Sequence, residues 1–172
     1  MESGNEELRK EILKKDFSNK AVVQIFEEAK KMGYHTEAFV MVGLPGETPE
    51  RFKDTVGLLR TIQPDLYSVS IYFPFQGTDL YKYAIDKGYI IPNFKIPDTF
   101  VSRRDTVLRI SDFGRNEILN SAKTLGWKIY KDHSLKKAIL FRIYESRLGD
   151  MLLRYGSFCK RPLRKLLIGK VN

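Results

Sequence analysis

The sequence predicts an α/β protein that ends in a helical region. Two short segments, residues 38–42 and 67–73, have the apolar and β-branched composition of strands. They lie about two dozen residues apart, which allows a helical crossover between parallel strands and is too long for a hairpin. From about residue 111 onward, apolar residues recur at helical spacing only. We therefore expect a fragment of an α/β barrel or of an open parallel sheet, followed by helices.

The chain begins with helical patterns. The first covers residues 6–14, and a second resumes at Asn19 and runs to Met32. Ser18 or Asn19 is the expected N-cap, since a short polar side chain can accept a hydrogen bond from the first turn. Gly33 is the expected stop, because glycine adopts the left-handed conformation that ends helices. The apolar stripe of the second helix contains Val22, Phe26 and Ala29.

The first predicted strand is Ala38–Val42, an unbroken apolar run followed by Gly43 and Pro45. Such a run is typical of a parallel strand that is covered on both faces. Thr48 then precedes Pro49, a residue suited to the first helical position because its missing N–H has no partner there. This combination predicts a helix.

The break at Gln63-Pro64-Asp65 ends that helix, and Tyr67–Phe73 forms the second predicted strand. A short helix is expected over residues 78–87, followed by irregular or partly extended chain to about residue 112. Three further helical patterns follow, marked by Ile118, Ala122 and Leu125, by Leu135, Ala138 and Ile139 after a Ser134 cap, and by Met151, Leu152 and Tyr155.

Length and composition exclude several classes of protein. The 172 residues have room for one ordinary domain. The single cysteine, Cys159, excludes an intrachain disulfide framework, a cysteine-rich zinc site and an iron–sulfur cluster held wholly by this chain. No apolar run is long enough to span a bilayer, and the polar N-terminus is unlike a signal peptide. We therefore expect a cytoplasmic protein without a membrane partner.

The positive charge is confined to the C-terminal part. Residues 1–100 contain 13 Lys and Arg against 15 Asp and Glu, whereas residues 101–172 contain 17 against 6. These charges alternate with apolar residues at helical spacing, which favours solvated faces of packed helices over a nucleic-acid partner.

Two loops are candidates for a binding site. The segment Gly43–Thr48 follows a strand and precedes a helix, at the sheet edge where α/β folds bind ligands. It lacks the lysine of a Walker phosphate loop, and no Gly-x-Gly-x-x-Gly motif follows the strand. Residues 72–78 leave the second strand at the same edge, and their aromatic rings could hold an adenine. A tight turn with a helix cap, and ordinary core packing, explain the same residues about as well.

Three motifs in order resemble a known family. They are Glu2-Ser3-Gly4-Asn5, the run MVGLPGET at residues 41–48, and Ser70–Phe75 followed by Gly77-Thr78. Together they resemble the second half of radical S-adenosylmethionine (radical SAM) enzymes, most closely those with a cobalamin-binding domain. The resemblance implies that residues 1–91 form the C-terminal half of a partial (β/α)₆ TIM-like barrel, from the end of its fourth strand to beyond its sixth. Residues 92–172 would then be an irregular linker and a basic α-helical region.

The same resemblance implies a cofactor site. Glu2 and Ser3 would approach the polar groups of S-adenosylmethionine, while Met41, Gly43 and the backbone around Phe73-Pro74 would border its adenine. The intact family protein uses S-adenosylmethionine and a four-iron four-sulfur cluster, with cobalamin as a further cofactor of the similar subfamily. No residue of this chain is implied as catalytic or as a metal ligand.

The sequence departs from the family in one respect. The Cys-x-x-x-Cys-x-x-Cys loop that holds the cluster belongs to the half that is absent here, and Cys159 cannot replace three thiolates. We therefore expect a fragment that is inactive alone and whose partner is the missing N-terminal half, or a separate chain carrying it. The substrate is not implied by these motifs.

An alternative is a non-catalytic module that binds RNA or an acidic partner. It would use Lys136, Lys137, Arg161, Arg164 and Lys165 as one patch. The helical spacing predicts instead that these residues point from different faces. His35 and His133 lack neighbouring ligands at metal-binding spacing and are expected to be solvent-facing or structural.

Overall fold

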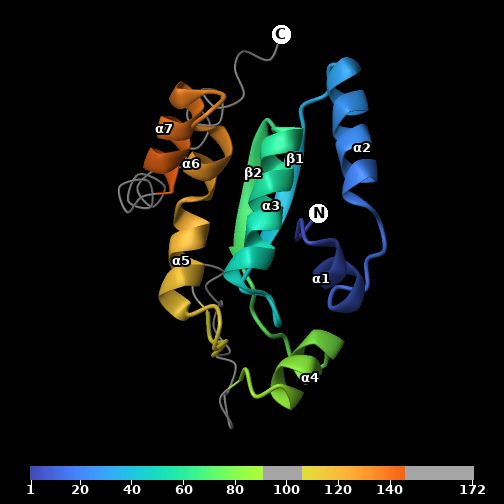
Figure 1. Cartoon of the computed structure of the whole chain (residues 1–172), viewed down its shortest axis with the longest axis vertical. Coiled ribbons are helices and arrows are strands. Elements are labelled where there is room, and N and C mark those ends of the chain that lie inside the picture. Colours follow the sequence, from blue (N-terminus) through green and yellow to red (C-terminus); the bar gives the residue numbers. More distant parts are fainter. Residues whose placement is uncertain (91–105, 146–172) are drawn as a thin grey trace.

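The computed structural model describes residues 1–90 and 106–145 (Figure 1). This part is a mixed α/β structure in which a two-stranded parallel sheet is flanked by helices. In chain order the elements are α1 (Glu6–Glu11), α2 (Asn19–Lys31), β1 (Glu37–Val42), α3 (Pro49–Ile62), β2 (Leu66–Ile71), α4 (Asp79–Asp86), α5 (Arg115–Lys123), α6 (Leu125–Tyr130) and α7 (Leu135–Tyr144). The predicted helix at residues 151–155 lies outside the described residues, as does most of the predicted linker.

The helix starts predicted from the sequence are confirmed. The side-chain oxygens of Ser18, Thr48, Thr78 and Ser134 each accept a hydrogen bond from the main chain of the first turn of α2, α3, α4 and α7. Pro49 occupies the start of α3, and Gln63 ends that helix in the left-handed conformation at φ 42°. The caps fix where each helix begins.

The two strands are parallel and in the predicted order, with Ala38 opposite Tyr67 and Val42 opposite Ile71. Helix α3 connects them as a crossover and lies across one face of the sheet (Figure 1). On that face Val40 and Val42 are buried against Leu59 and other apolar side chains. The parallel α/β arrangement predicted for the first part of the chain is therefore confirmed, whereas closure into a barrel is not shown.

Two expectations need correction. The first strand is not covered on both faces, because Phe39, on the face away from α3, is 60% exposed and Met41 is only half-buried. The helix expected around Ile118, Ala122 and Leu125 is two helices, because the chain leaves helical geometry at Thr124, where α5 ends and α6 begins. Their apolar stripe is nevertheless buried, since Ile118 and Leu125 are both fully buried.

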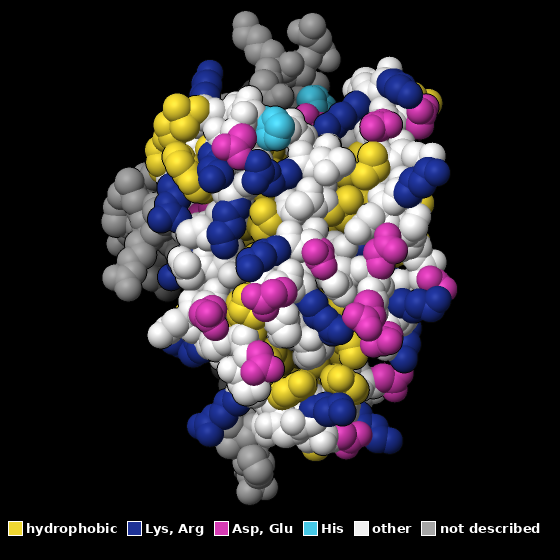
Figure 2. Space-filling view, in the orientation of Figure 1, with side chains coloured by type: hydrophobic (Ala, Val, Ile, Leu, Met, Phe, Trp, Pro, Cys, Tyr) yellow, Lys and Arg dark blue, Asp and Glu magenta, His cyan; other side chains and the backbone are white. Residues whose placement is uncertain are grey.

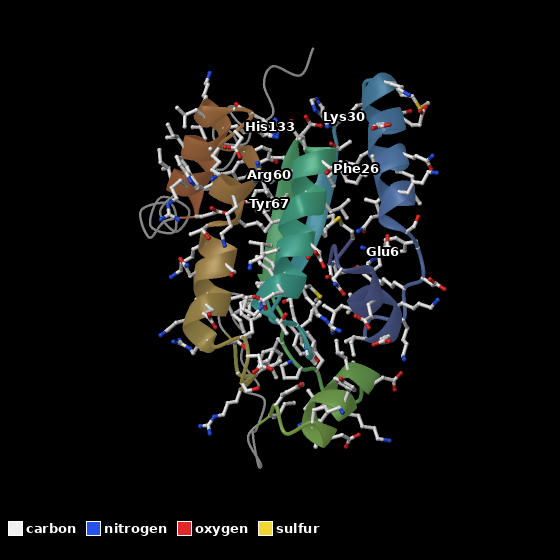
Figure 3. All side chains as sticks on the ribbon, in the orientation of Figure 1. Glu6, Phe26, Lys30, Arg60, Tyr67 and His133 are labelled. Carbon is white, nitrogen blue, oxygen red and sulfur yellow. The ribbon has the colours of Figure 1, made fainter. Side chains whose placement is uncertain are left out.

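Helix α2 packs against α3, and α6 and α7 pack on each other beside β2 (Figure 1). Figure 3 shows Phe26 and Lys30 between α2 and α3. The Lys30 ammonium donates to the main-chain oxygens of Ile62 and Gln63, at 2.6 and 2.8 Å, and so binds the free carbonyls at the C-terminus of α3. No helix in residues 1–90 or 106–145 is long and apolar enough to cross a membrane.

Candidate functional site

Three segments meet at the carboxyl end of the sheet. The main-chain N–H of Met41 donates to the oxygen of Glu2 at 2.8 Å, so the first residues of the chain lie beside β1. The N–H of Tyr72 donates to the oxygen of Val42 at 2.9 Å, which keeps the chain after β2 beside the end of β1. The three motifs singled out in the sequence therefore lie side by side, at the edge where parallel α/β sheets bind ligands.

Glu2 and Ser3 are held in different ways. Glu2 is half-buried and pairs with Lys15. Burial raises the pKa of its carboxyl group, but Lys15, the N-terminal charge and a main-chain hydrogen bond together lower it. Ser3 is fully buried, with its hydroxyl 3.4 Å from that of Thr55 on α3 and accepting the N–H of Asn5 at 3.2 Å. Ser3 thus anchors the first residues to α3, and its predicted contact with a cofactor stays a prediction.

The other predicted residues are mostly buried. Gly43 and Pro74 are buried, and Phe73 is 5% exposed with its ring edge-on to Phe75 at 5.3 Å between centroids. Met41 is half-buried on the open face of the sheet. Of the six predicted residues, only Glu2 and Met41 therefore present partly exposed side chains at this edge, and the others contribute buried packing and main chain.

Sequence reasoning missed Glu47. One oxygen of its carboxyl group, Oε2, accepts the N–H groups of Gly43 at 2.7 Å and of Leu44 at 3.3 Å, which closes the loop after β1. The side chain is fully buried, and its other oxygen, Oε1, has no hydrogen-bond partner in the described part of the chain. Burial raises the pKa of Glu47 to about 8, although the two N–H groups act in the opposite direction.

Gly43 is required at its position in this loop. Its φ is +76°, a conformation that favours glycine, and a Cβ atom there would lie 3.1 Å from the side chain of Ile118 on α5. The presence of glutamate four residues after this glycine is the sequence signal that could have identified Glu47 as the residue that closes the loop.

A second buried polar cluster lies at the opposite end of β2. The hydroxyl of Tyr67, labelled in Figure 3, donates to Oε1 of Glu145, and this carboxylate oxygen also accepts the N–H of Gly126 at 3.2 Å. The Tyr67 ring stacks on Phe141 with 4.6 Å between centroids. Burial raises the pKa of Glu145 to about 7. This cluster joins the C-terminal helices to the sheet, and the sequence offered no local signal for it because Tyr67 and Glu145 are 78 residues apart.

The described part of the predicted basic patch is divided. Lys136 is exposed, whereas the Lys137 ammonium donates to the main-chain oxygen of Pro64 at 3.0 Å and lies 4.4 Å from the centroid of the Tyr130 ring. Burial lowers the pKa of Lys137. Adjacent lysines therefore differ in role, a difference that is not predicted from the sequence, where the helical spacing indicates one solvated pair. Arg161, Arg164 and Lys165 lie outside the described residues.

No group of three or more His, Cys, Asp or Glu side chains that could hold a metal ion occurs in residues 1–90 and 106–145. His35 and His133 are both exposed, and the closest carboxylate oxygen to His35 belongs to Asp65, 4.0 Å from Nδ1. A cavity of about 660 Å³ is lined by residues 106–111 and Arg115, and none of the six predicted cofactor-binding residues lines it.

Comparisons with known proteins extend the sequence evidence. An uncharacterized methyltransferase of Pyrococcus horikoshii is 25% identical over 91% of this chain and 31% of its own length. A probable threonylcarbamoyladenosine tRNA methylthiotransferase of Pyrococcus abyssi is 38% identical over 40% of this chain and 18% of its own length. An anaerobic magnesium-protoporphyrin IX monomethyl ester cyclase of Rubrivivax gelatinosus is 28% identical over 71% of this chain and 22% of its own length.

These relatives are radical SAM types of enzyme. At this low identity they support the superfamily indicated by the three motifs, and not a subtype within it. The chain spans about a third of the length of the first relative and less than a quarter of the length of the other two. No family model matches the chain.

Proposed function

We propose that this chain supplies the S-adenosylmethionine-binding side of a radical SAM enzyme whose iron–sulfur cluster is held by residues outside it. The observation that carries the proposal is the meeting of the three motifs at one sheet edge, where the N–H of Met41 joins the oxygen of Glu2 at 2.8 Å. Similarity to radical SAM types of enzyme supports it at the level of the superfamily.

The residues present do not fit the iron–sulfur cluster. The sequence contains one cysteine, and the described residues contain no alternative group of ligands. The edge fits part of S-adenosylmethionine better, because the half-buried Met41 is joined through its main-chain N–H to the oxygen of Glu2 and precedes Gly43 by two residues. An apolar side chain next to main-chain polar groups suits a flat adenine ring. When bound in an intact enzyme, S-adenosylmethionine supplies the 5′-deoxyadenosyl radical.

The partial barrel is part of this proposal. Strands β1 and β2 are parallel neighbours, residues 1–3 lie beside β1 through the hydrogen bond from Met41 to Glu2, and α3 covers one face. The face with Phe39 and Met41 corresponds to a barrel interior. Cobalamin dependence rests on the sequence resemblance and remains a further proposal.

The proposed partner is a polypeptide segment that carries the three cluster cysteines. It would join the sheet on the side where residues 1–3 border β1. The helix layer on that side presents Ile25 and Met32 of α2, which are 67% and 69% exposed, while Phe26 faces α3. An exposed strand edge beside exposed apolar helix residues favours a partner that adds a strand to the sheet and a helix next to α2. An adjacent reading frame with the cysteine triplet would identify this partner.

Anaerobic reconstitution tests whether the iron–sulfur cluster is held by residues outside this chain. The chain is incubated with iron, sulfide and a reductant, and then assayed for cluster absorbance and for 5′-deoxyadenosine after addition of S-adenosylmethionine. We expect neither signal, because one cysteine cannot hold the cluster. Formation of 5′-deoxyadenosine by this chain alone would contradict the proposal.

A matched pair of variants tests the proposed edge. Binding of S-adenosylmethionine is measured by isothermal titration calorimetry for the full chain, for Met41→Lys and for Met32→Lys. We expect the first substitution to weaken binding at least about tenfold, because it places a charge beside the cationic ligand. The second changes an exposed methionine on α2 and should leave binding unchanged. Equal affinities for the two variants would place the ligand elsewhere.

A further inference from the structure

Helix α7 has two apolar faces. Ala138 and Phe141 are buried against the rest of the protein, at 0% and 2% exposure. Leu135 and Ile139, which are one turn apart on another face, are 57% and 45% exposed, and Ile143 in the next turn is 41% exposed. Exposed apolar side chains that gather on one face of a helix mark an interaction surface. The outward face of α7 therefore indicates a contact beyond the described residues.

The surroundings of this face are cationic. Figure 2 shows hydrophobic side chains gathered over α7, with Lys and Arg side chains around them. The two carboxylates of residues 125–145 are both engaged, since Asp132 pairs with Arg60 and Glu145 binds Tyr67. The exposed basic residues on and beside this helix are Lys123, Lys131, Lys136 and Arg142.

The sequence continues the same composition beyond α7. Residues 146–172 contain seven Lys and Arg but one Asp, and they are rich in leucine. Clusters of four to eight basic residues near an apolar helix face are typical of proteins that recognise anionic lipid surfaces. The charge of the chain thus favours a negatively charged occupant for the α7 face.

We propose that this face docks on the surface of an anionic lipid membrane. Leu135 and Ile139 enter the boundary between headgroups and acyl chains, and the surrounding Lys and Arg side chains contact the lipid phosphates. Trp127, 38% exposed on α6, belongs to the helix that packs against α7. The protein would lie on the membrane through this face, a contact that differs from the sequence-based expectation of no membrane partner.

Two other occupants fit the observations less well. A partner helix docks into an apolar groove, whereas α7 lies at the outer edge of the described part of the molecule (Figure 1), and the cavity of about 660 Å³ is lined by residues 106–111 and Arg115 instead. A nucleic acid is held by cations interleaved with aromatic stacking platforms, whereas the centre of this face is aliphatic. A lipid surface accommodates both the aliphatic residues and the basic ones.

Vesicle sedimentation tests the proposal with the full chain. The probes are vesicles of phosphatidylcholine alone and vesicles that also contain phosphatidylglycerol. We expect binding to the anionic vesicles at least about tenfold tighter than to the neutral ones, and weaker binding as salt rises. Because Trp127 is the only tryptophan of the chain, its fluorescence reports on the same contact without a label.

Two sets of substitutions distinguish binding through this face from nonspecific adsorption to vesicles. The double variant Leu135→Gln and Ile139→Gln should bind anionic vesicles at least about tenfold more weakly. Ile85→Gln on α4, where the isoleucine is 47% exposed, is the matched control and should bind as the unaltered chain does. Circular dichroism checks that all variants are folded.

Several results would overturn the proposal. Vesicle binding that survives the double substitution would assign the contact to another part of the chain. Failure to bind anionic vesicles, combined with a dimer in light scattering that the double variant dissociates, would assign the face to a second copy. Tight binding to polyuridylate that the double variant loses, without vesicle binding, would assign it to RNA.

Discussion

Substituting Glu47 tests how a buried carboxyl group closes the loop after β1. Burial raises its pKa from 4.5 to about 8. The folded state therefore retains a proton between these pH values that the unfolded state releases, and the free energy of unfolding must fall as pH rises through this window. The free energy of unfolding falls by at most about 1.4 kcal/mol per pH unit. Over the whole window the loss has an upper bound of about 5 kcal/mol.

Glu47→Gln replaces the neutral acid by a group of the same shape that does not titrate. Its oxygen can still accept the N–H groups of Gly43 and Leu44. We expect this variant to lie within about 1 kcal/mol of the unaltered protein near neutral pH, and to lack the Glu47 part of the pH dependence. Glu47→Ala leaves both N–H groups without an acceptor and should cost about 2–6 kcal/mol.

The assay is urea unfolding followed by circular dichroism at several pH values between about 5 and 8. Glu50→Gln, which changes an exposed carboxylate in the first turn of α3, is the control. The reasoning is refuted if unaltered protein and Glu47→Gln lose stability equally as pH rises, or if Glu47→Ala costs less than about 1 kcal/mol.

Three further predictions use the same unfolding assay. Gly126→Ala places a Cβ 2.5 Å from the Tyr67 hydroxyl and should lower the free energy of unfolding by at least about 2 kcal/mol. Gly57→Ala, in open space on α3, should raise it by up to about 1 kcal/mol. Equal effects of the two substitutions would contradict the packing at α6. Glu145→Gln should flatten the decline in stability as pH rises from 4.5 toward about 7, and an unchanged pH profile would show that this carboxyl group is not buried. Arg9→Ala should cost at least about 2 kcal/mol because the fully buried guanidinium donates to three acceptors, and a neutral effect would refute that network.

Much of the local structure could be predicted from the sequence. The caps at Ser18, Thr48 and Ser134 are confirmed, and so is the parallel pairing of the two strands. These features depend on neighbours in sequence or on the length of one crossover, which local patterns record. The meeting of the two loops after β1 and β2 at one edge follows from the same parallel order, and the hydrogen bond from Met41 to Glu2 adds the first motif.

The sequence by itself determined where helices and strands form, because caps, turns and apolar runs act over a few residues. Only the tertiary structure decided which polar groups are buried and with whom. Ser3 meets Thr55, Glu47 closes its own loop, and Glu145 reaches Tyr67 across 78 residues. It also decided that Phe39 lies on an open face although its run is apolar throughout. Burial depends on which distant segment packs against a residue, and local periodicity does not record that segment.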